Sequence, residues 1–367
     1  MELYYIRKGR IAVKTKNRET YLDILRIISM LAVIMIHITC NIVASLSPSS
    51  GYRWYYGNFF LTLSRFSVPI FIMISGKIFL TSKKVEDIKY LYKKILHLII
   101  ILITWGIFYN LLEAILKNRQ PFQLTTIRHA ISLTFLGTTR YHLWYLYVII
   151  GLYIITPILR VFIKHASKKE LEYFLITWFI FVSILPFLTH FHIFRHLLIF
   201  THFDVAMISG YIGYYVLGYY LDTNNFDKKE KKWIYILGIL GFLFTFGTVL
   251  INYYRLHQYD TFLHTYMMPG IIFMSIALFL FTKETCNTHV LHDRLKKILS
   301  ILANVSLGVY LVHDVFLSYI FPFGIRFTII YKHTWILLPA YFLLISICSI
   351  LTSWILSKIP VIKKYFI

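Results

Sequence analysis

Two residues in the first apolar run of the chain, Arg26 and His37, have the types and the spacing to do chemistry together. On a helix, eleven steps of about 100° bring their side chains to within roughly 20° of one face, about 16 Å apart along the axis. An arginine binds anionic groups such as phosphates, and a neutral histidine accepts a proton near pH 7. One helix face would therefore offer an anion-binding end and a proton-accepting end.

Four further ionisable residues fall in or beside later apolar runs: Arg65, His142, His313 and Asp314. Counting about 1.5 Å per residue from the end of each run places all four, together with His37, in the outer third of a membrane. Ionisable residues inside a membrane usually face the bundle interior or a watery cavity, so each is a candidate functional residue. Their convergence from separate helices is hard to explain by packing alone.

Structural roles stay open for several of these residues. Arg26 can anchor the helix by pairing with Asp23, and His37 can be satisfied by a neighbouring helix. Asp314 can orient an imidazole or face the outer headgroups. Snorkelling, solvation or an aromatic belt explains the other charged and indole residues near span ends, which are Lys77, Arg160, Glu113, Trp54, Trp105, Trp144 and Trp233.

The composition requires a membrane around these residues. Of the 367 residues, 58% are hydrophobic and only 15% are charged, against roughly 45–50% and about 25% in soluble domains. A soluble enzyme is therefore excluded. The formal charge of +22 does not indicate nucleic acid, because the basic residues cluster in short segments between apolar runs. The three cysteines lack the paired spacing of a disulfide framework or a zinc site.

Apolar runs of about 20 residues are long enough to cross the roughly 30 Å hydrocarbon core of a bilayer. The sequence predicts an all-α, polytopic bundle of ten transmembrane helices. The run 205–221 is short, and its glycines would let neighbouring helices approach closely. The ten runs are 24–44, 59–80, 95–116, 143–163, 171–189, 205–221, 233–253, 266–282, 298–321 and 334–357.

Alternate connections between these runs are rich in lysine and arginine. One set of connections, which includes both chain ends, carries 25 of these basic residues, and the other set carries 9. By the positive-inside rule, this alternation predicts that both termini lie in the cytoplasm. We expect a basic cytoplasmic N-terminus over 1–20, a ten-helix transmembrane domain over 21–358 and a cytoplasmic tail over 359–367, in a bacterial cell-membrane protein.

Five sequence blocks occur in order from near residue 20 to near residue 313. They are Tyr21–Arg26 with the later His37, RFSVPIFIMISGKIFL from Arg65, YHLWYLYVIIGLYIITPILR from Tyr141, YYVLGYYL from Tyr214 and SLGVYLVH from Ser306. Together these blocks resemble the acyltransferase-3 family of membrane acyltransferases. The resemblance implies ten transmembrane helices, an acyl-CoA donor from the cytoplasm and an O-linked acyl product on a cell-surface glycan.

The sequence departs from the family pattern at two places. Where members often carry an Arg-x-x-Arg pair after the second span, this chain has Lys94 and His97, preceded by Lys93. Lys77 replaces the tyrosine that usually follows Ser75 and Gly76. The residues that contact the donor phosphates therefore stay open.

The residues and the resemblance together predict an O-acyltransferase that moves an acyl group, acetyl in the first instance, from acyl-CoA to a glycan hydroxyl. His37 would deprotonate the hydroxyl as general base, and an acyl-imidazole intermediate on His37 is the alternative. Arg65 and His313 would stabilise the oxyanion or orient the acceptor. The hypothesis needs no metal.

The expected binding residues divide between the two substrates. Arg26, Lys93 and Lys94 would bind the phosphates of acetyl-CoA, the co-substrate. The residues expected to contact the substrates near the outer face are His142, Trp144 and Asp314.

A transporter or flippase of a polysaccharide precursor is the rival interpretation, because polar groups at the midplane are expected there too. An inverted repeat would favour it, and the hydropathy order shows none. The expected partners are acyl-CoA, a glycan or lipid-linked sugar acceptor and membrane lipids, but no nucleic acid. Whether the chain forms a homo-oligomer stays open.

Overall fold

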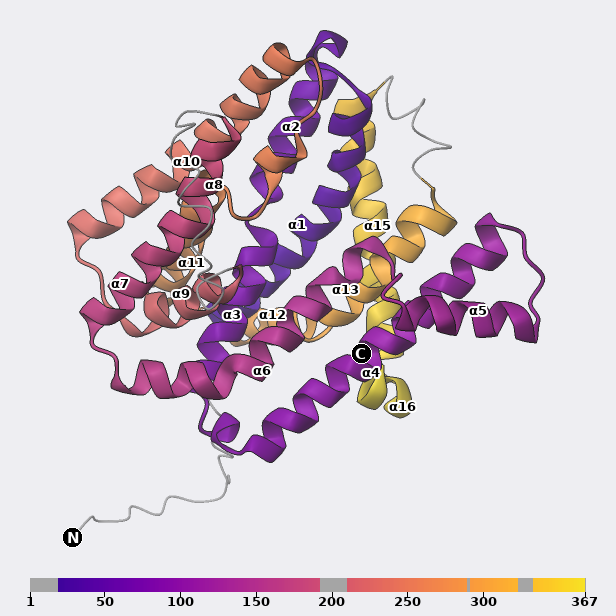
Figure 1. Cartoon of the computed structure of the whole chain (residues 1–367), viewed down its shortest axis with the longest axis horizontal. Helices are drawn as coiled ribbons and strands as arrows, with labels where there is room; N and C mark the ends of the chain where they lie inside the picture. The colour runs from indigo at the N-terminus through magenta and orange to yellow at the C-terminus, as the bar shows by residue number, and fades with distance from the viewer. Residues whose placement is uncertain (1–18, 192–209, 289–290, 323–332, 367) are drawn as a thin grey trace.

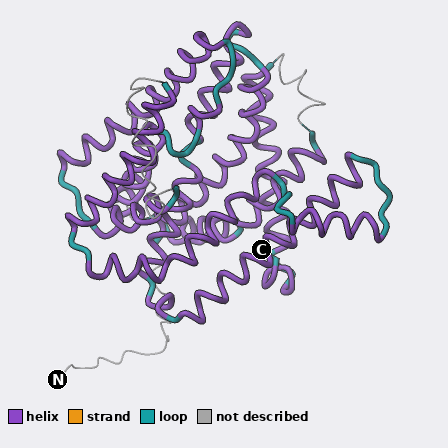
Figure 2. The backbone as a smooth tube through the Cα atoms, in the orientation of Figure 1, coloured by secondary structure: helices purple, strands orange, loops and turns teal. Residues whose placement is uncertain are grey.

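The chain folds into a bundle of helices that cross one another at varied angles (Figure 1). The computed structural model describes residues 19–191, 210–288, 291–322 and 333–366. Every regular element in these ranges is a helix, which confirms the all-α class (Figure 2). The helices are α1 (Thr20–Ser45), α2 (Tyr52–Ser64), α3 (Ser67–Thr81), α4 (Ile88–Leu112), α5 (Leu124–Phe135), α6 (Trp144–His165), α7 (Lys168–Phe179), α8 (Leu185–His190), α9 (Ile212–Thr223), α10 (Lys228–Leu256), α11 (Pro269–Thr288), α12 (Asp293–Asn304), α13 (Ser306–Val315), α15 (Thr334–Leu356) and α16 (Pro360–Tyr365).

Eight helices in the described residues are long and apolar enough to cross a membrane. A ninth span forms if α12 and α13, which meet at a bend of 52°, are counted as one. Each of the ten predicted runs contains a helix where it is described, but the run 205–221 differs in length. Its first residues lie outside the described ranges, and α9 has 12 residues, which reach about 18 Å and do not cross the bilayer.

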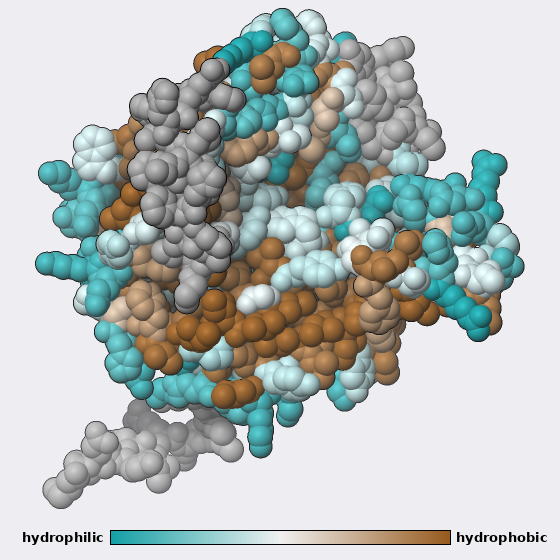
Figure 3. Space-filling view, in the orientation of Figure 1, coloured by the Kyte–Doolittle hydropathy of each residue, from teal (hydrophilic) through white to brown (hydrophobic). Residues whose placement is uncertain are grey.

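The outer surfaces of the long helices are apolar, as contact with lipid requires. Side chains such as Ile239 and Ile251 of α10 and Ile347 and Leu351 of α15 are more than half exposed. Figure 3 shows an apolar surface across the middle of the molecule, with hydrophilic residues gathered toward its edges. The multi-pass membrane class expected from composition is thus confirmed.

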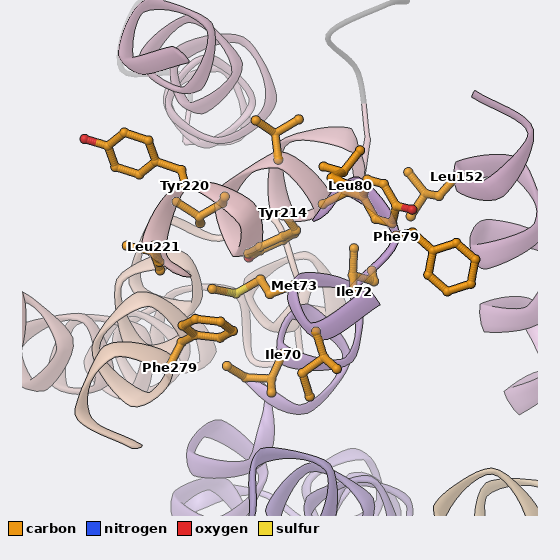
Figure 4. Close-up of a cluster of buried hydrophobic side chains, with 14 of the residues drawn as sticks. Ile70, Ile72, Met73, Phe79, Leu80, Leu152, Tyr214, Tyr220, Leu221 and Phe279 are labelled. Carbon is orange, nitrogen blue, oxygen red and sulfur yellow. The ribbon is translucent and has the colours of Figure 1, made fainter. Parts of the chain in front are cut away.

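Helices α3 and α9 form the tightest contact of the core. A Cβ atom added at Gly76 would lie 1.8 Å from the carbonyl oxygen of Tyr215, and one at Gly218 would lie 2.0 Å from that of Met73. Only glycine allows the two backbones to approach so closely. Figure 4 shows apolar side chains of both helices interleaved around this contact. Helix α9 is therefore a buried half-span and not the full span that the sequence predicted, while its glycines allow the close approach to α3 that was expected.

Helix α5 is an element that the sequence did not predict. It packs along α4, where Gly106 leaves room for Thr134, and Nδ2 of Asn110 donates to Oγ1 of Thr134 at 3.0 Å and to the carbonyl of Thr138 at 2.9 Å. These contacts fix the loop that follows α5. That loop ends at Arg140, which enters the site described below.

Candidate active site

His37 lies in the middle of a cluster of aromatic rings from three separate segments. Its ring stacks on His313 of α13, with centroids 5.2 Å apart and planes 22° apart. The rings of Tyr141 and His142, just before α6, lie 5.0 Å and 6.5 Å away. No hydrogen bond joins the His37 ring to another described residue, so both of its nitrogens are available to a substrate.

Two cavities meet at His37. The first, which we call the Arg26 cavity, measures about 520 Å³ and extends from Arg26 to His37 and His142. The second, the Arg65 cavity, measures about 820 Å³ and contains Arg65 on its wall. Both are bordered by Ile36, His37, Trp144 and Tyr266. A molecule in either cavity can therefore reach the His37 ring.

The far end of the Arg26 cavity is basic. Arg26, Lys94 and His97 line it, together with Tyr90, and the Lys94 ammonium lies 5.7 Å from the centre of the Tyr90 ring. Lys93, the other lysine expected to bind phosphates, is exposed and is not among the residues that line this cavity.

Arg26 also pairs with Asp23, as the anchor interpretation expected. Its Nη1 lies 3.0 Å from Oδ1 of Asp23, and a quarter of the arginine side chain remains exposed. The carboxylate is buried. Arg26 lines the cavity as well as pairing with Asp23, so the anchor role and a place on the cavity wall are compatible.

The other two histidines of the cluster are buried and differ in their partners. Nδ1 of His313 lies 2.7 Å from the carbonyl of Tyr310, which can only accept, so Nδ1 carries the hydrogen and the neutral ring has its lone pair on Nε2. Both ring nitrogens of His142 are buried without a hydrogen-bond partner among the described residues. His142 lines the Arg26 cavity, whereas His313 lies behind His37, outside the residues that line either cavity.

Asp314 takes part in a buried ion pair that the sequence did not predict. Its Oδ2 accepts from Nε of Arg140 at 2.5 Å, and its Oδ1 accepts from Tyr141 and from Ser318, each at 2.7 Å. The carboxylate is fully buried, so it does not face lipid headgroups, and no imidazole hydrogen-bonds to it. It does not line either cavity; Arg140, Tyr141 and Ser318 stand between it and the Arg65 cavity.

Arg140 joins three parts of the bundle. Besides Asp314, it donates from Nη2 to Ser318 at 2.7 Å and from Nη1 to Glu113 at 3.1 Å. Burial opposes its charge, but the hydrogen bond and the charge of Asp314 outweigh burial and raise the pKa of the guanidinium. Arg140 directly precedes the Tyr-His-Leu-Trp block. Arg140 is one of four basic residues between the runs 95–116 and 143–163, and its place directly before a family motif was the signal that could have found it.

Arg65 lies at the break between α2 and α3. Its guanidinium carbon is 5.5 Å from the centre of the Tyr266 ring, and its Nε is buried without a hydrogen-bond partner among the described residues. Trp144 stacks on the same Tyr266 ring at a centroid distance of 5.7 Å. Tyr266 thus holds Arg65 and Trp144 at the boundary between the two cavities.

Two other charged residues inside the apolar runs have structural partners. Lys77 is buried and pairs with Glu19 and with Asp222, the latter at 3.5 Å. Arg160 donates to the carbonyl of Phe79 at 2.8 Å and pairs with Glu86 at 3.1 Å. Neither residue belongs to the histidine cluster. Within the described residues, no group of three or more histidine, cysteine, aspartate or glutamate side chains is arranged to hold a metal ion.

Apolar helices around a histidine at the junction of two cavities define a multi-pass membrane protein with internal cavities. The family model described as an acyltransferase domain matches residues 19–358. The chain therefore belongs to the acyltransferase-3 family, as its sequence blocks indicated, and is a membrane acyltransferase. No curated protein and no solved structure gives a significant match to the sequence.

Proposed function

We propose that the protein is an O-acyltransferase that moves an acyl group, acetyl in the simplest case, from acyl-CoA to a hydroxyl of a glycan or lipid-linked sugar. The observation that carries this proposal is that His37 lines both cavities. One cavity can hold the donor and the other the acceptor, with the reacting atoms brought together at the imidazole.

The distribution of charged and neutral groups along the Arg26 cavity complements that of acyl-CoA. The donor carries phosphates at one end and its thioester at the other, joined by a long, thin arm. The cavity is basic at the end that holds Arg26, Lys94 and His97, and has neutral polar groups at the end that holds His37 and His142. Arginine and lysine are the residues that bind phosphates, so the basic end suits the nucleotide part of CoA.

In the proposed reaction, the acceptor hydroxyl loses its proton to His37 as its oxygen attacks the thioester carbonyl carbon. The carbon–sulfur bond then breaks, CoA leaves as a thiolate, and the proton on His37 passes to that sulfur. The products are the O-acyl sugar, CoA thiol and neutral His37, so no external oxidant or reductant is needed.

His142 and His313 support this step in different ways. His142 has unpartnered nitrogens on the donor cavity, so its ring N–H can donate to the thioester oxygen as negative charge develops there. His313 is held by the Tyr310 carbonyl and stacks on His37. It therefore positions the base, and it contacts neither substrate in this proposal.

The proposed orientation places the Arg26 end of the bundle in the cytoplasm, where acyl-CoA is made. The alternation of basic connections supports this orientation. The Arg65 cavity then faces the opposite side, so an acceptor can be modified without entering the cytoplasm.

The test measures acetyl-CoA consumption and acyl transfer by purified protein in detergent. We expect wild type to release CoA thiol, and His37→Gln to lower the rate by about 10²–10⁴ while acetyl-CoA affinity stays within twofold. Glutamine keeps hydrogen-bonding capacity but cannot act as a base. His129→Gln, which changes an exposed histidine of α5, serves as the matched control.

Two results would contradict the proposal. If His37→Gln transfers acyl groups at the wild-type rate, His37 is not the base. If wild type neither binds nor consumes acetyl-CoA but moves a labelled sugar across proteoliposomes, the transporter interpretation is correct.

A further inference from the structure

The Arg65 cavity is lined by three cationic side chains and by no carboxylate of the described residues. The cations are Arg65, Lys117 and Arg140. The rest of the polar wall consists of neutral groups, including Asn41, Ser45, Tyr141 and Ser318. Hydroxyl and amide groups of this kind are typical of a sugar site, but the excess of positive charge is not required by a neutral sugar.

Two of the three cations are already compensated by carboxylates behind the wall. Lys117 lies 3.1 Å from Glu113, and Arg140 lies 2.5 Å from Asp314 and 3.1 Å from Glu113. Arg65 differs. No carboxylate of the described residues pairs with it, and its Nε is buried without a partner among them. The neighbours that stabilise its charge are two tyrosines, Tyr266 and Tyr259.

Arg65 is half-buried, and a guanidinium that has lost part of its hydration is destabilising unless a counter-charge is supplied. A cation–π contact replaces only part of the hydration that an arginine loses. Because Arg65 lines a cavity of about 820 Å³, a ligand in that cavity can supply the missing charge.

We propose that the acceptor carries an anionic group, a carboxylate or a phosphate, that pairs with Arg65. This inference rests on the proposed function, since it identifies the Arg65 cavity with the acceptor site. It narrows the acceptor to an acidic sugar or a sugar phosphate. Arginine suits either group because its fork donates two parallel hydrogen bonds.

The anion lies close to the hydroxyl that reacts. Tyr266 borders both cavities and carries the Arg65 guanidinium on its ring. His37 borders the same two cavities. Arg65 is thus separated from the junction by a single aromatic ring, which places the charge on the sugar unit that is acylated or on the one bonded to it.

A different role for Arg65, stabilisation of the oxyanion, makes a different prediction. An oxyanion forms with every acceptor, so its loss would slow transfer to charged and neutral acceptors equally. If Arg65 instead binds an anionic group of the acceptor, its loss weakens the binding of charged acceptors and leaves the binding of neutral acceptors unchanged. Acceptor binding measured without any donor separates these roles, since no oxyanion forms in that experiment.

The test uses three probes with the same alkyl chain and sugar ring: octyl glucoside, octyl glucuronide and octyl glucose 6-phosphate. Binding to purified full-length protein is measured by calorimetry in a maltoside detergent. We expect wild type to bind one or both anionic probes about 10- to 100-fold more tightly than the glucoside, the range for a charge-assisted bidentate pair. Preference for the glucuronide assigns a carboxylate, and preference for the sugar phosphate assigns a phosphate.

Variants test whether the preference for anionic probes over the glucoside depends on Arg65. Arg65→Gln should abolish the preference, and Arg65→Lys should keep part of it. Arg128→Gln, which removes an exposed cation of α5 outside the cavity lining, should change it by less than about threefold. Acetyl-CoA affinity of each variant reports whether the bundle is still folded.

Equal affinity of wild type for all three probes would overturn the inference, as would a preference that survives in folded Arg65→Gln. Either result, with acetyl-CoA consumption intact, leaves the proposed function standing. Failure to bind acetyl-CoA refutes the proposed function instead.

Discussion

Arg140 and Asp314 should be energetically coupled, so that the loss of Arg140 destabilises the fold much more when Asp314 is charged than when it is neutral. Asp314 is fully buried and accepts three hydrogen bonds. Replacing Arg140 by methionine keeps the length of the side chain but leaves the carboxylate without its counter-charge. Removing one partner of a buried pair costs about 3–5 kcal/mol. The contact with Glu113 adds at most about 1 kcal/mol, because that carboxylate is 38% exposed.

The same substitution should cost much less once the carboxylate is neutral. In the Asp314→Asn background, Arg140→Met removes hydrogen bonds to Ser318 and Glu113 but leaves no buried charge without a partner. We therefore expect the free energy of unfolding to fall by about 1–2 kcal/mol. The coupling energy is then about 2–3 kcal/mol. Lys117→Met is the control, because its exposed pair with Glu113 contributes at most about 1 kcal/mol.

The assay is reversible unfolding of the four purified variants in mixed detergent micelles, followed by tryptophan fluorescence. If Arg140→Met costs the same in both backgrounds to within about 0.5 kcal/mol, the two residues are not coupled. The assignment of Arg140 as the stabilising partner of Asp314 would then fail.

Two further predictions concern the donor and the orientation of the bundle. Arg26→Ala should weaken acyl-CoA affinity, measured by calorimetry, about 10- to 100-fold. Lys93→Ala, outside the cavity wall, should change this affinity less than twofold. Equal losses in the two variants would show that the donor phosphates bind elsewhere. A cysteine introduced near Arg255 should react with an impermeant thiol reagent in intact cells, and one near Lys229 only after permeabilisation. Labelling near Lys229 in intact cells would reverse the proposed orientation.

The sequence predicted the helices and the convergence of the histidines because both follow from position along the chain. Hydropathy sets where a helix begins and ends, and a rise of about 1.5 Å per residue sets the depth of each side chain. The rings of His37, His142 and His313, taken from three separate runs, do lie within 6.5 Å of one another. Arg26 and His37 also share a cavity, as their common helix face indicated.

The lateral arrangement of the helices could not be obtained from the same arguments. Depth does not say which faces meet, so the sequence could not distinguish Lys94, on the cavity, from its neighbour Lys93. The bend of 52° beside Val305 occurs without a proline, and the nearby Ser306 and Gly308 are equally common inside a continuous membrane span. Arg140 reaches Asp314 only because α5 folds back along α4, and a helix of 12 residues is too short to be found as a span.

The pairing of charges across the bundle distinguishes Arg65 from the other cations inside or beside the apolar runs. Sequence alone treats every intramembrane charge as a functional candidate. The structure pairs Lys77 with Asp222, Arg160 with Glu86 and Arg140 with Asp314, and each pair joins helices or loops distant in the chain. Arg65 has no such carboxylate among the described residues and lies on a cavity that reaches His37. A charge that the fold leaves uncompensated at an open cavity is the one that a ligand is needed to neutralise.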